Sequence, residues 1–155
     1  MSDLTTYYQM IEDCITQLGV DPVTARGEEA GQWSLVKGSA KVWLDLWHIE
    51  REGRAYFQAL SPVMKLTEVI PDKRLELFEE LLKINHSLYG VAFTCYNDFL
   101  WIKVIREAAG MDKEEALAMI SRVGTYSDEY DDYLREKYLP PQPPVGPPHA
   151  PNAPV

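Results

Sequence analysis

Five segments of alternating apolar and polar residues constrain the fold of this chain more than any other feature. They fall into two groups, and tight turns join the segments within each group. The alternating segments are residues 32–37, 41–49, 54–63, 89–96 and 99–105. A period of two is typical of strands with one buried face. Gly38-Ser39 and Asn97-Asp98 are two-residue hairpin turns, and residues 51–53 form a longer one. Because such short connections permit only antiparallel pairing, the sequence predicts a five-stranded antiparallel sheet.

Three other segments repeat apolar residues every three or four positions, which is typical of amphipathic helices. The first carries a stripe made of Tyr7, Met10, Ile11, Cys14 and Leu18. Ser2 or Asp3 is expected to cap its N-terminus, and Gly19 its C-terminus. Residues 21–31 follow without periodicity, and we expect a loop there.

The second helix is predicted to begin at Pro71-Asp72, since proline is favoured in a first turn and acids are favoured near the positive end of the helix dipole. One side of this helix carries Leu75, Phe78, Leu81, Leu82 and Asn85. Leu77 and Ile84 widen the stripe, and we therefore expect two buried faces.

The third helix is predicted to follow Asp112, which forms a capping box with Glu115. Its apolar seam consists of Leu117, Ile120, Val123 and Leu134. Pro140 ends the helix because proline cannot continue it. The complete order αβββαββα predicts an α+β fold in which three helices cover an antiparallel sheet.

The chain divides into a predicted domain, residues 1–139, and a tail, residues 140–155. The tail holds eight of the eleven prolines of the chain. Such a segment forms neither a helix nor a central strand, and we expect polyproline II structure or disorder.

The alternation assigns the strand residues to two faces of the sheet. One set is rich in aliphatic residues and is expected to face the helices: Trp33, Leu35, Val42, Leu44, Leu46, Ala55, Phe57, Val91, Phe93, Leu100, Ile102 and Val104. The other set mixes large aromatic residues with polar ones: Trp43, Asp45, Trp47, Tyr56, Gln58, Thr94, Tyr96, Phe99, Trp101 and Lys103.

The second set holds three of the four tryptophans, whereas a solvated face is normally polar. Tryptophan and tyrosine are enriched at interface hot spots. We therefore predict a partner-binding or self-association surface at Trp43, Trp47, Tyr56, Tyr96 and Trp101. The alternative is that the first helix or the tail covers these rings within the same chain.

Charge excludes several classes of partner. The formal net charge is −9, which argues against binding to nucleic acid or to an anionic membrane surface. No apolar run is long enough to span a bilayer, and the N-terminus lacks the features of a signal peptide, so we expect a cytoplasmic protein. Cys14 and Cys95 are expected to be buried free thiols. With only three histidines, widely spaced, we expect no metal site and no cofactor.

Few residues suggest catalysis. His86 falls at the end of the second helix, where it can answer the helix dipole, and the neighbouring Asn85 is expected to bond a nearby loop. The acidic cluster at residues 128–132 does not match a calcium-binding loop and is expected to be solvated. An enzyme that uses these acids or His86 is the least favoured hypothesis.

Three segments together resemble the YbjN family of bacterial proteins: LLKINHSLYGVAF, the hairpin around Asn97-Asp98, and GMDKEEALAMISRVGTYSDEYDDYL. The shared pattern is a Leu-x-x-x-Asn helix end, a small-residue strand, a hairpin, an Asp-x-x-Glu helix start and an acidic stretch at residues 128–132. The family is similar in fold to type III secretion chaperones. The resemblance implies a chaperone-like α+β domain, frequent dimerisation and the binding of a protein segment without catalysis.

These observations favour a cytoplasmic, non-enzymatic module that forms a homodimer and holds an extended segment of another protein. Sheet edges would pair with the backbone of that segment, and the aromatic face would hold its side chains. The alternative hypothesis is a regulatory or signalling adaptor that is recruited through its Pro-rich tail.

Overall fold

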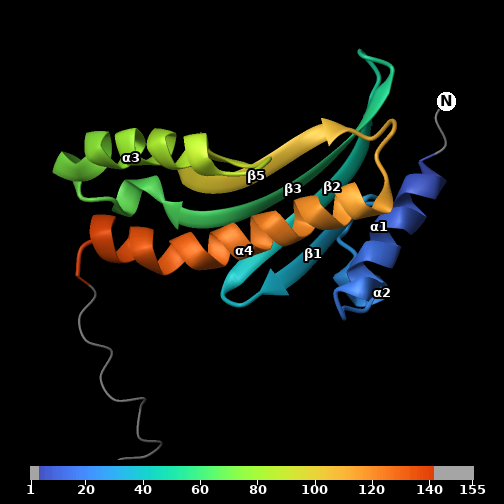
Figure 1. Ribbon diagram of the computed structural model, residues 1–155, viewed down its shortest axis with the longest axis horizontal. Coiled ribbons are helices and arrows are strands. Elements are labelled where there is room, and N and C mark those ends of the chain that lie inside the picture. The colour runs from blue at the N-terminus through green and yellow to red at the C-terminus, as the bar shows by residue number, and fades with distance from the viewer. Residues whose placement is uncertain (1–3, 142–155) are drawn as a thin grey trace, which may run out of the picture.

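The computed structural model describes residues 4–141 and contains the predicted sheet (Figure 1). Its strands are β1 (Gln32–Lys37), β2 (Ala40–Ile49), β3 (Arg54–Lys65), β4 (Ala92–Tyr96) and β5 (Phe99–Glu107). All neighbours are antiparallel, in the order β1-β2-β3-β5-β4. The turn residues Asn97 and Asp98 both have positive φ, as a type I′ hairpin turn requires. The α+β prediction is confirmed.

The described residues form four α-helices, one more than the sequence predicts: α1 (Thr5–Gln17), α2 (Pro22–Ala25), α3 (Arg74–Ser87) and α4 (Lys113–Tyr138). The prediction of a loop over residues 21–31 is therefore wrong in part. The Asp21 side chain accepts a hydrogen bond from the Val23 N–H, and Pro22 occupies the first turn. A helix of four residues is too short to show a periodic pattern.

The ends of the long helices follow the predicted chemistry in most places. Asp112 and Glu115 form the capping box of α4. Two short 3-10 turns, η1 (Leu66–Glu68) and η2 (Pro71–Lys73), lead into α3. Helix α1 starts after Leu4, which makes no side-chain cap, and the predicted caps Ser2 and Asp3 lie outside the described residues. Gly19 follows the helix with a φ of +84°, a conformation that glycine adopts readily.

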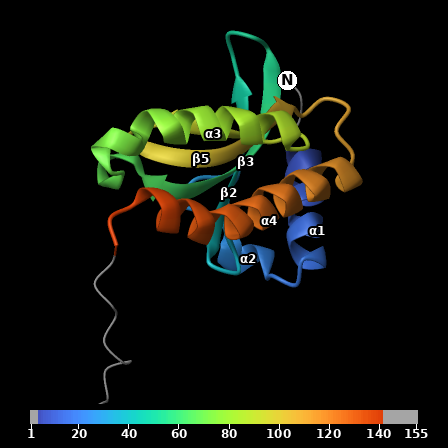
Figure 2. The same ribbon diagram turned by 60° about the vertical axis from the view of Figure 1, so that its left-hand side comes forward.

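The helices lie on one side of the sheet. Helix α4 contacts β1, β2, β3 and β5, whereas α1 packs on α4 and α3 contacts the edge strand β4. Helix α4 lies across the sheet, with α1 and α2 at the end where α4 begins (Figure 1), and α3 runs alongside α4 (Figure 2). Close approach requires small residues: a Cβ on Gly124 of α4 would lie 3.1 Å from the Lys37 side chain.

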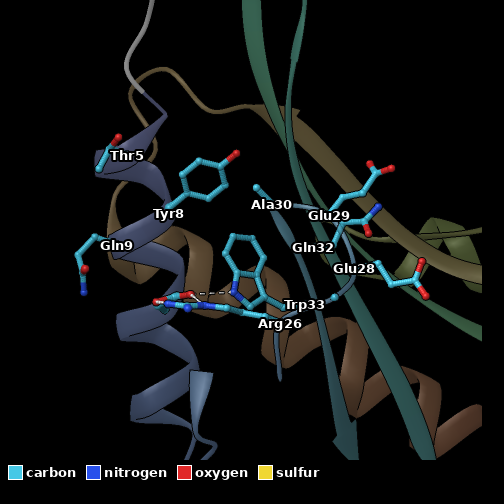
Figure 3. Close-up of a pocket in the computed structure, with 12 residues that line it drawn as sticks. Thr5, Tyr8, Gln9, Arg26, Glu28, Glu29, Ala30, Gln32 and Trp33 are labelled. Carbon is cyan, nitrogen blue, oxygen red and sulfur yellow. Dashed lines mark hydrogen bonds and ion pairs between the residues drawn. The ribbon is translucent and has the colours of Figure 1, made fainter. Parts of the chain in front are cut away.

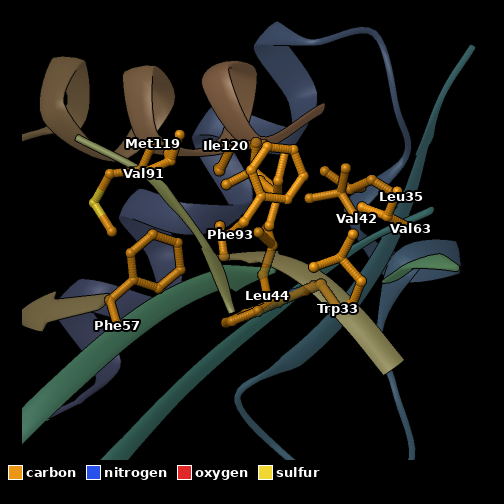
Figure 4. Close-up of a cluster of buried hydrophobic side chains, with 14 of the residues drawn as sticks. Trp33, Leu35, Val42, Leu44, Phe57, Val63, Val91, Phe93, Met119 and Ile120 are labelled. Carbon is orange, nitrogen blue, oxygen red and sulfur yellow. The ribbon is translucent and has the colours of Figure 1, made fainter. Parts of the chain in front are cut away.

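The hydrophobic core lies between α4 and the aliphatic face of the sheet (Figure 4). Eleven of the twelve residues predicted for this face are buried, and Val104 is partly buried against them. Ile120, Val123 and Leu134 of α4 are buried above it, and Leu117 is partly buried. The buried hydroxyls of Ser61 and Ser127, 2.7 Å apart, satisfy each other between β3 and α4.

Two predictions about burial are wrong. Helix α3 buries only one face, through Leu77 and Leu81, while Leu75 and Leu82 are 80% and 71% exposed. Every turn of this helix carries several apolar residues, so periodicity does not select a single face. Cys14 is buried as expected, but Cys95 is exposed because it lies on the edge strand beside the 97–98 turn.

Candidate functional site

The face of the sheet opposite the helices, here called the open face, displays the aromatic residues singled out from the sequence. Trp43 of β2 is 38% exposed, and its ring centroid lies 5.4 Å from that of Trp101 on β5. Phe99 packs on Trp101 at 6.0 Å. Trp43, Phe99 and Trp101 therefore form one aromatic cluster, which spans three strands because β3 separates β2 from β5.

A second pair of rings lies farther along the same face. Trp47 and Tyr56 are cross-strand partners with centroids 6.1 Å apart. The Tyr56 hydroxyl donates a hydrogen bond to Glu52, and this bond raises the pKa of Tyr56. Beside them, the Gln58 amide donates to the Asp45 carboxylate at 2.8 Å. This half of the face is thus aromatic and acidic, with its acids already hydrogen-bonded.

Tyr96 differs from the other four predicted residues. Its side chain is 69% exposed, and its backbone carbonyl accepts a hydrogen bond from the Trp101 indole N–H at 3.0 Å. The structure therefore brings Trp43 and Trp101 together, and Trp47 and Tyr56 together, and leaves the Tyr96 ring at the margin. Among the described residues, no helix covers these rings: α1 packs instead on α4, and its Tyr8 meets Trp33 on the buried face.

Two lysines of the open face were not singled out from the sequence. Lys41 lies on β2 two residues before Trp43, and the Lys65 ammonium lies 5.9 Å from the centre of the Phe99 ring. Lys103, which the alternation did assign to this face, follows Trp101 by two residues. The parity of Lys41 was a signal that could have revealed it, whereas Lys65 follows a β-bulge in β3 that shifts the alternation.

The two edges of the sheet are closed to different degrees. On β4, the Asn85 side chain accepts a hydrogen bond from the Phe93 N–H at 2.7 Å and donates one to the Phe93 carbonyl at 3.3 Å. Asn85 thus bonds a strand rather than the predicted loop, and occupies the edge as a neighbouring strand would. On β1, the Gly27 N–H bonds Gln32, but Val36 remains 70% exposed.

The acidic cluster at residues 128–132 has a structural contact that its sequence does not reveal. Asp128 accepts hydrogen bonds from the backbone N–H and the hydroxyl of Ser39, at 3.0 and 3.1 Å. These bonds lower the pKa of Asp128. A Cβ on Gly38, which has a φ of +59°, would lie 2.4 Å from the same carboxylate, so a larger residue there would be strained and would displace Asp128. Asp128 therefore holds the β1–β2 hairpin against α4, which argues against a catalytic role.

A second polar contact joins α3 to the end of α4. Glu80 accepts hydrogen bonds from the Tyr133 and Tyr138 hydroxyls and from the Lys137 ammonium, the last at 2.9 Å. Burial alone would raise the pKa of Glu80, but these three bonds outweigh it and lower the pKa. Burial and the bond to Glu80 raise the pKa of Tyr138 to about 12. His86, the other residue weighed for catalysis, is exposed in the last turn of α3.

A cavity of about 420 Å³ lies between α1 and the segment that leads into β1 (Figure 3). Arg26 binds Glu12 through two hydrogen bonds of 2.7 and 2.9 Å, and the Trp33 indole N–H donates to the same carboxylate at 3.2 Å. Because Glu12 is satisfied by these donors, it is a structural group rather than a free base. Within residues 4–141, no group of histidine, cysteine and acidic residues is arranged to hold a metal ion. No described helix is long and apolar enough to cross a membrane.

Solved structures with the same architecture define the class of fold. The "Crystal Structure of the ExsC-ExsE Complex" aligns with a TM-score of 0.63 and 13% identity, over 86% of this chain and 97% of that chain. The "Structure of the HopA1-SchA Chaperone-Effector Complex" aligns with a TM-score of 0.59 and 7% identity, over 85% of this chain and 99% of that chain. The type III secretion chaperone-like fold predicted from the sequence is confirmed.

The sequence itself identifies the family. The family model of YbjN, described as "Putative bacterial sensory transduction regulator", matches residues 8–136. The chain belongs to the YbjN family. No curated protein sequence matches it.

Proposed function

We propose that this chain is a cytoplasmic, non-enzymatic, chaperone-like protein that holds an extended segment of another protein against its open face. The observation that carries this proposal is the aromatic cluster of Trp43, Phe99 and Trp101, which no described helix covers. Stiff, amphipathic rings on an accessible surface are typical of interface hot spots. Asp128, one of the acids at residues 128–132 that an enzyme would have used, already holds the β1–β2 hairpin against α4.

The sheet edge beside the cluster supports the same proposal. Leu35 of β1 lies opposite Val42 of β2, next to the Gly38-Ser39 turn. Ser34 and Val36 alternate with Leu35, so their backbone N–H and C=O groups point away from β2 along the outer edge of β1. Val36 is also 70% exposed. A partner segment could therefore add a strand here and place alternate side chains over the open face. The two solved structures named above are complexes by their titles, and one is called a chaperone-effector complex.

The test is to recover partners with the full chain and with variants that lose aromatic rings on or off the open face. Trp43→Ser with Trp101→Ser removes two rings of the cluster. Tyr89→Ser is the matched control, because Tyr89 is 72% exposed but precedes β4 and lies off the open face. We expect partners to be lost with the double variant and kept with the control. Equal recovery by all three proteins would contradict a site on the open face.

We further propose that the chain forms a homodimer through the exposed side of α3. Leu75 and Leu82 are two turns apart on this helix and are both largely exposed. Two copies of α3 related by a two-fold axis would bury both leucines of each subunit.

Light scattering at micromolar concentration should therefore give twice the monomer mass. Leu75→Glu with Leu82→Glu should give the monomer, while Leu18→Glu with Val23→Glu should remain dimeric, since that apolar pair is also exposed but belongs to the end of α1 and to α2, which lie away from α3 (Figure 1). A monomer mass for the unmodified chain at high concentration would rule the dimer out.

A further inference from the structure

We propose that the segment held on the open face is acidic, with carboxylate side chains placed between apolar ones. This inference rests on the proposed function and names the chemistry of the partner. It follows from three lysines, Lys41, Lys65 and Lys103, that lie around the aromatic cluster.

Strand geometry places these lysines on the same face as the rings. Lys41 and Trp43 are two residues apart on β2, as are Trp101 and Lys103 on β5, and side chains two residues apart share a face. The Lys65 ammonium lies over the Phe99 ring. Leu60, which pairs with both Trp43 and Lys103, fills the space between β2 and β5. The surface is thus apolar in the middle and cationic around it.

These three lysines are among the eight basic residues of the described part that form no ion pair within it, and they share one face of the sheet. Seven other basic residues of the described part form ion pairs: Arg26, Arg51, Arg54, Lys83, Arg106, Arg135 and Lys137. Lys41, Lys65 and Lys103 form none with any residue between 4 and 141, although acids outnumber bases by 24 to 15 in the whole sequence. Three like charges left together on an acidic protein provide electrostatic complementarity for an anionic partner.

The acids of the open face lie at its other end and are already engaged. Gln58 donates to Asp45, Tyr56 to Glu52 and Arg54 to Glu107. The face is therefore divided into a cationic half around Trp43 and Trp101 and an acidic half around Trp47 and Tyr56. This division gives a bound segment a preferred direction, with its carboxylates over the lysines.

A polypeptide fits this surface better than a nucleic acid. Affinity for nucleic acid grows with the number of phosphates neutralised, and three lysines on a chain of net charge −9 neutralise few. The outer edge of β1 offers main-chain hydrogen-bonding groups that only another polypeptide backbone can pair in register.

The experiment uses three labelled synthetic peptides of about ten residues, the length of a long strand. All carry the same leucine and phenylalanine residues at alternate positions, with Glu, Gln or Lys between them. Fluorescence anisotropy measures their affinity for the full chain, for Lys41→Glu with Lys103→Glu, and for Lys83→Glu with Lys113→Glu. The last pair changes the net charge equally but lies on α3 and at the start of α4.

We expect the Glu peptide to bind at least about tenfold more tightly than the Gln peptide, because opposite charges lie across the surface. Added salt and the Lys41/Lys103 variant should remove this advantage, whereas the Lys83/Lys113 variant should keep it. Equal affinities for the Glu and Gln peptides, equal effects of the two double variants, or tighter binding of an oligothymidylate than of the Glu peptide would each overturn the proposal.

The outcomes also separate this inference from the proposed function. If Glu and Gln peptides bind equally and both are lost with Trp43→Ser and Trp101→Ser, the open face binds a segment but does not select acids. If no peptide binding depends on either tryptophan, both proposals fail.

Discussion

The two faces of the sheet are built on the same strands and have opposite compositions. On β2, Val42, Leu44 and Leu46 are at most 2% exposed beneath α4, whereas Trp43 between them is 38% exposed. The larger and more hydrophobic side chain is thus the more accessible one. The aliphatic residues provide the buried apolar surface that drives folding, and the rings of the open face are not part of this core. Rings of this size on an accessible face are better explained by a partner than by folding.

The largest loss of stability is expected from a substitution on the buried face of the sheet. Phe57 on β3 is fully buried between the sheet and the helices. Phe57→Ala removes its packing and leaves a cavity, which should lower the free energy of unfolding by about 3–5 kcal/mol. Urea denaturation followed by circular dichroism measures the change. A loss below about 1 kcal/mol would mean that this face is not the core.

On the open face, the same kind of truncation should act mainly on binding. Trp43→Ser with Trp47→Ser removes two half-exposed rings, and we expect a loss of stability of about 2 kcal/mol or less. Partner recovery should fall much further. Calorimetry of the monomer decides the matter, because a collapse of its melting temperature would show these tryptophans to be core residues.

The contact between α3 and the end of α4 should make the stability of the fold depend on pH through Glu80. The pKa of Glu80 in the folded chain lies below its unfolded value of 4.5. Its contribution to the free energy of unfolding is therefore complete above pH 4.5 and is lost as the pH falls through the folded pKa. Glu80→Gln should cost about 1–2 kcal/mol at neutral pH, since it removes hydrogen bonds to a charged acceptor. Stability of the variant should fall less steeply below pH 4.5 than that of the unmodified chain. Parallel acid curves for the two proteins would show that Glu80 does not titrate with folding.

Neither face is expected to depend on the tail. Cutting the chain after Leu139 retains every described helix and strand. We expect the free energy of unfolding to change by less than about 1 kcal/mol, because a proline-rich segment without an apolar stripe buries little. Comparison of denaturation midpoints and amide NMR spectra tests this expectation. A larger loss would mean that the tail packs on the domain, and that residues 1–139 are not a complete folding unit.

The sequence predicted what is encoded locally. Period-two alternation and the Asn97-Asp98 turn define strands, and the Asp112 capping box defines the start of α4, because each depends on neighbours a few residues apart. The contact of Asp128 with Ser39 joins residues 89 positions apart, and no local pattern indicates it. The exposed side of α3 was also missed, since Leu75 and Leu82 are as apolar as the buried Leu77 and Leu81. At the candidate site, alternation placed the rings correctly, but Lys65 follows a bulge that interrupts the alternation.

Asn85 has a consequence for how many copies of the chain can join through their strands. An open sheet has two edge strands, and a protein in which both are free can pair with further copies into an assembly of unlimited length. Because the Asn85 side chain bonds the Phe93 backbone on β4, β1 is the edge strand left for pairing in the described part of this chain. Strand pairing between copies is therefore expected to stop at two chains, and replacing Asn85 with an apolar residue should free the β4 edge and permit longer assemblies.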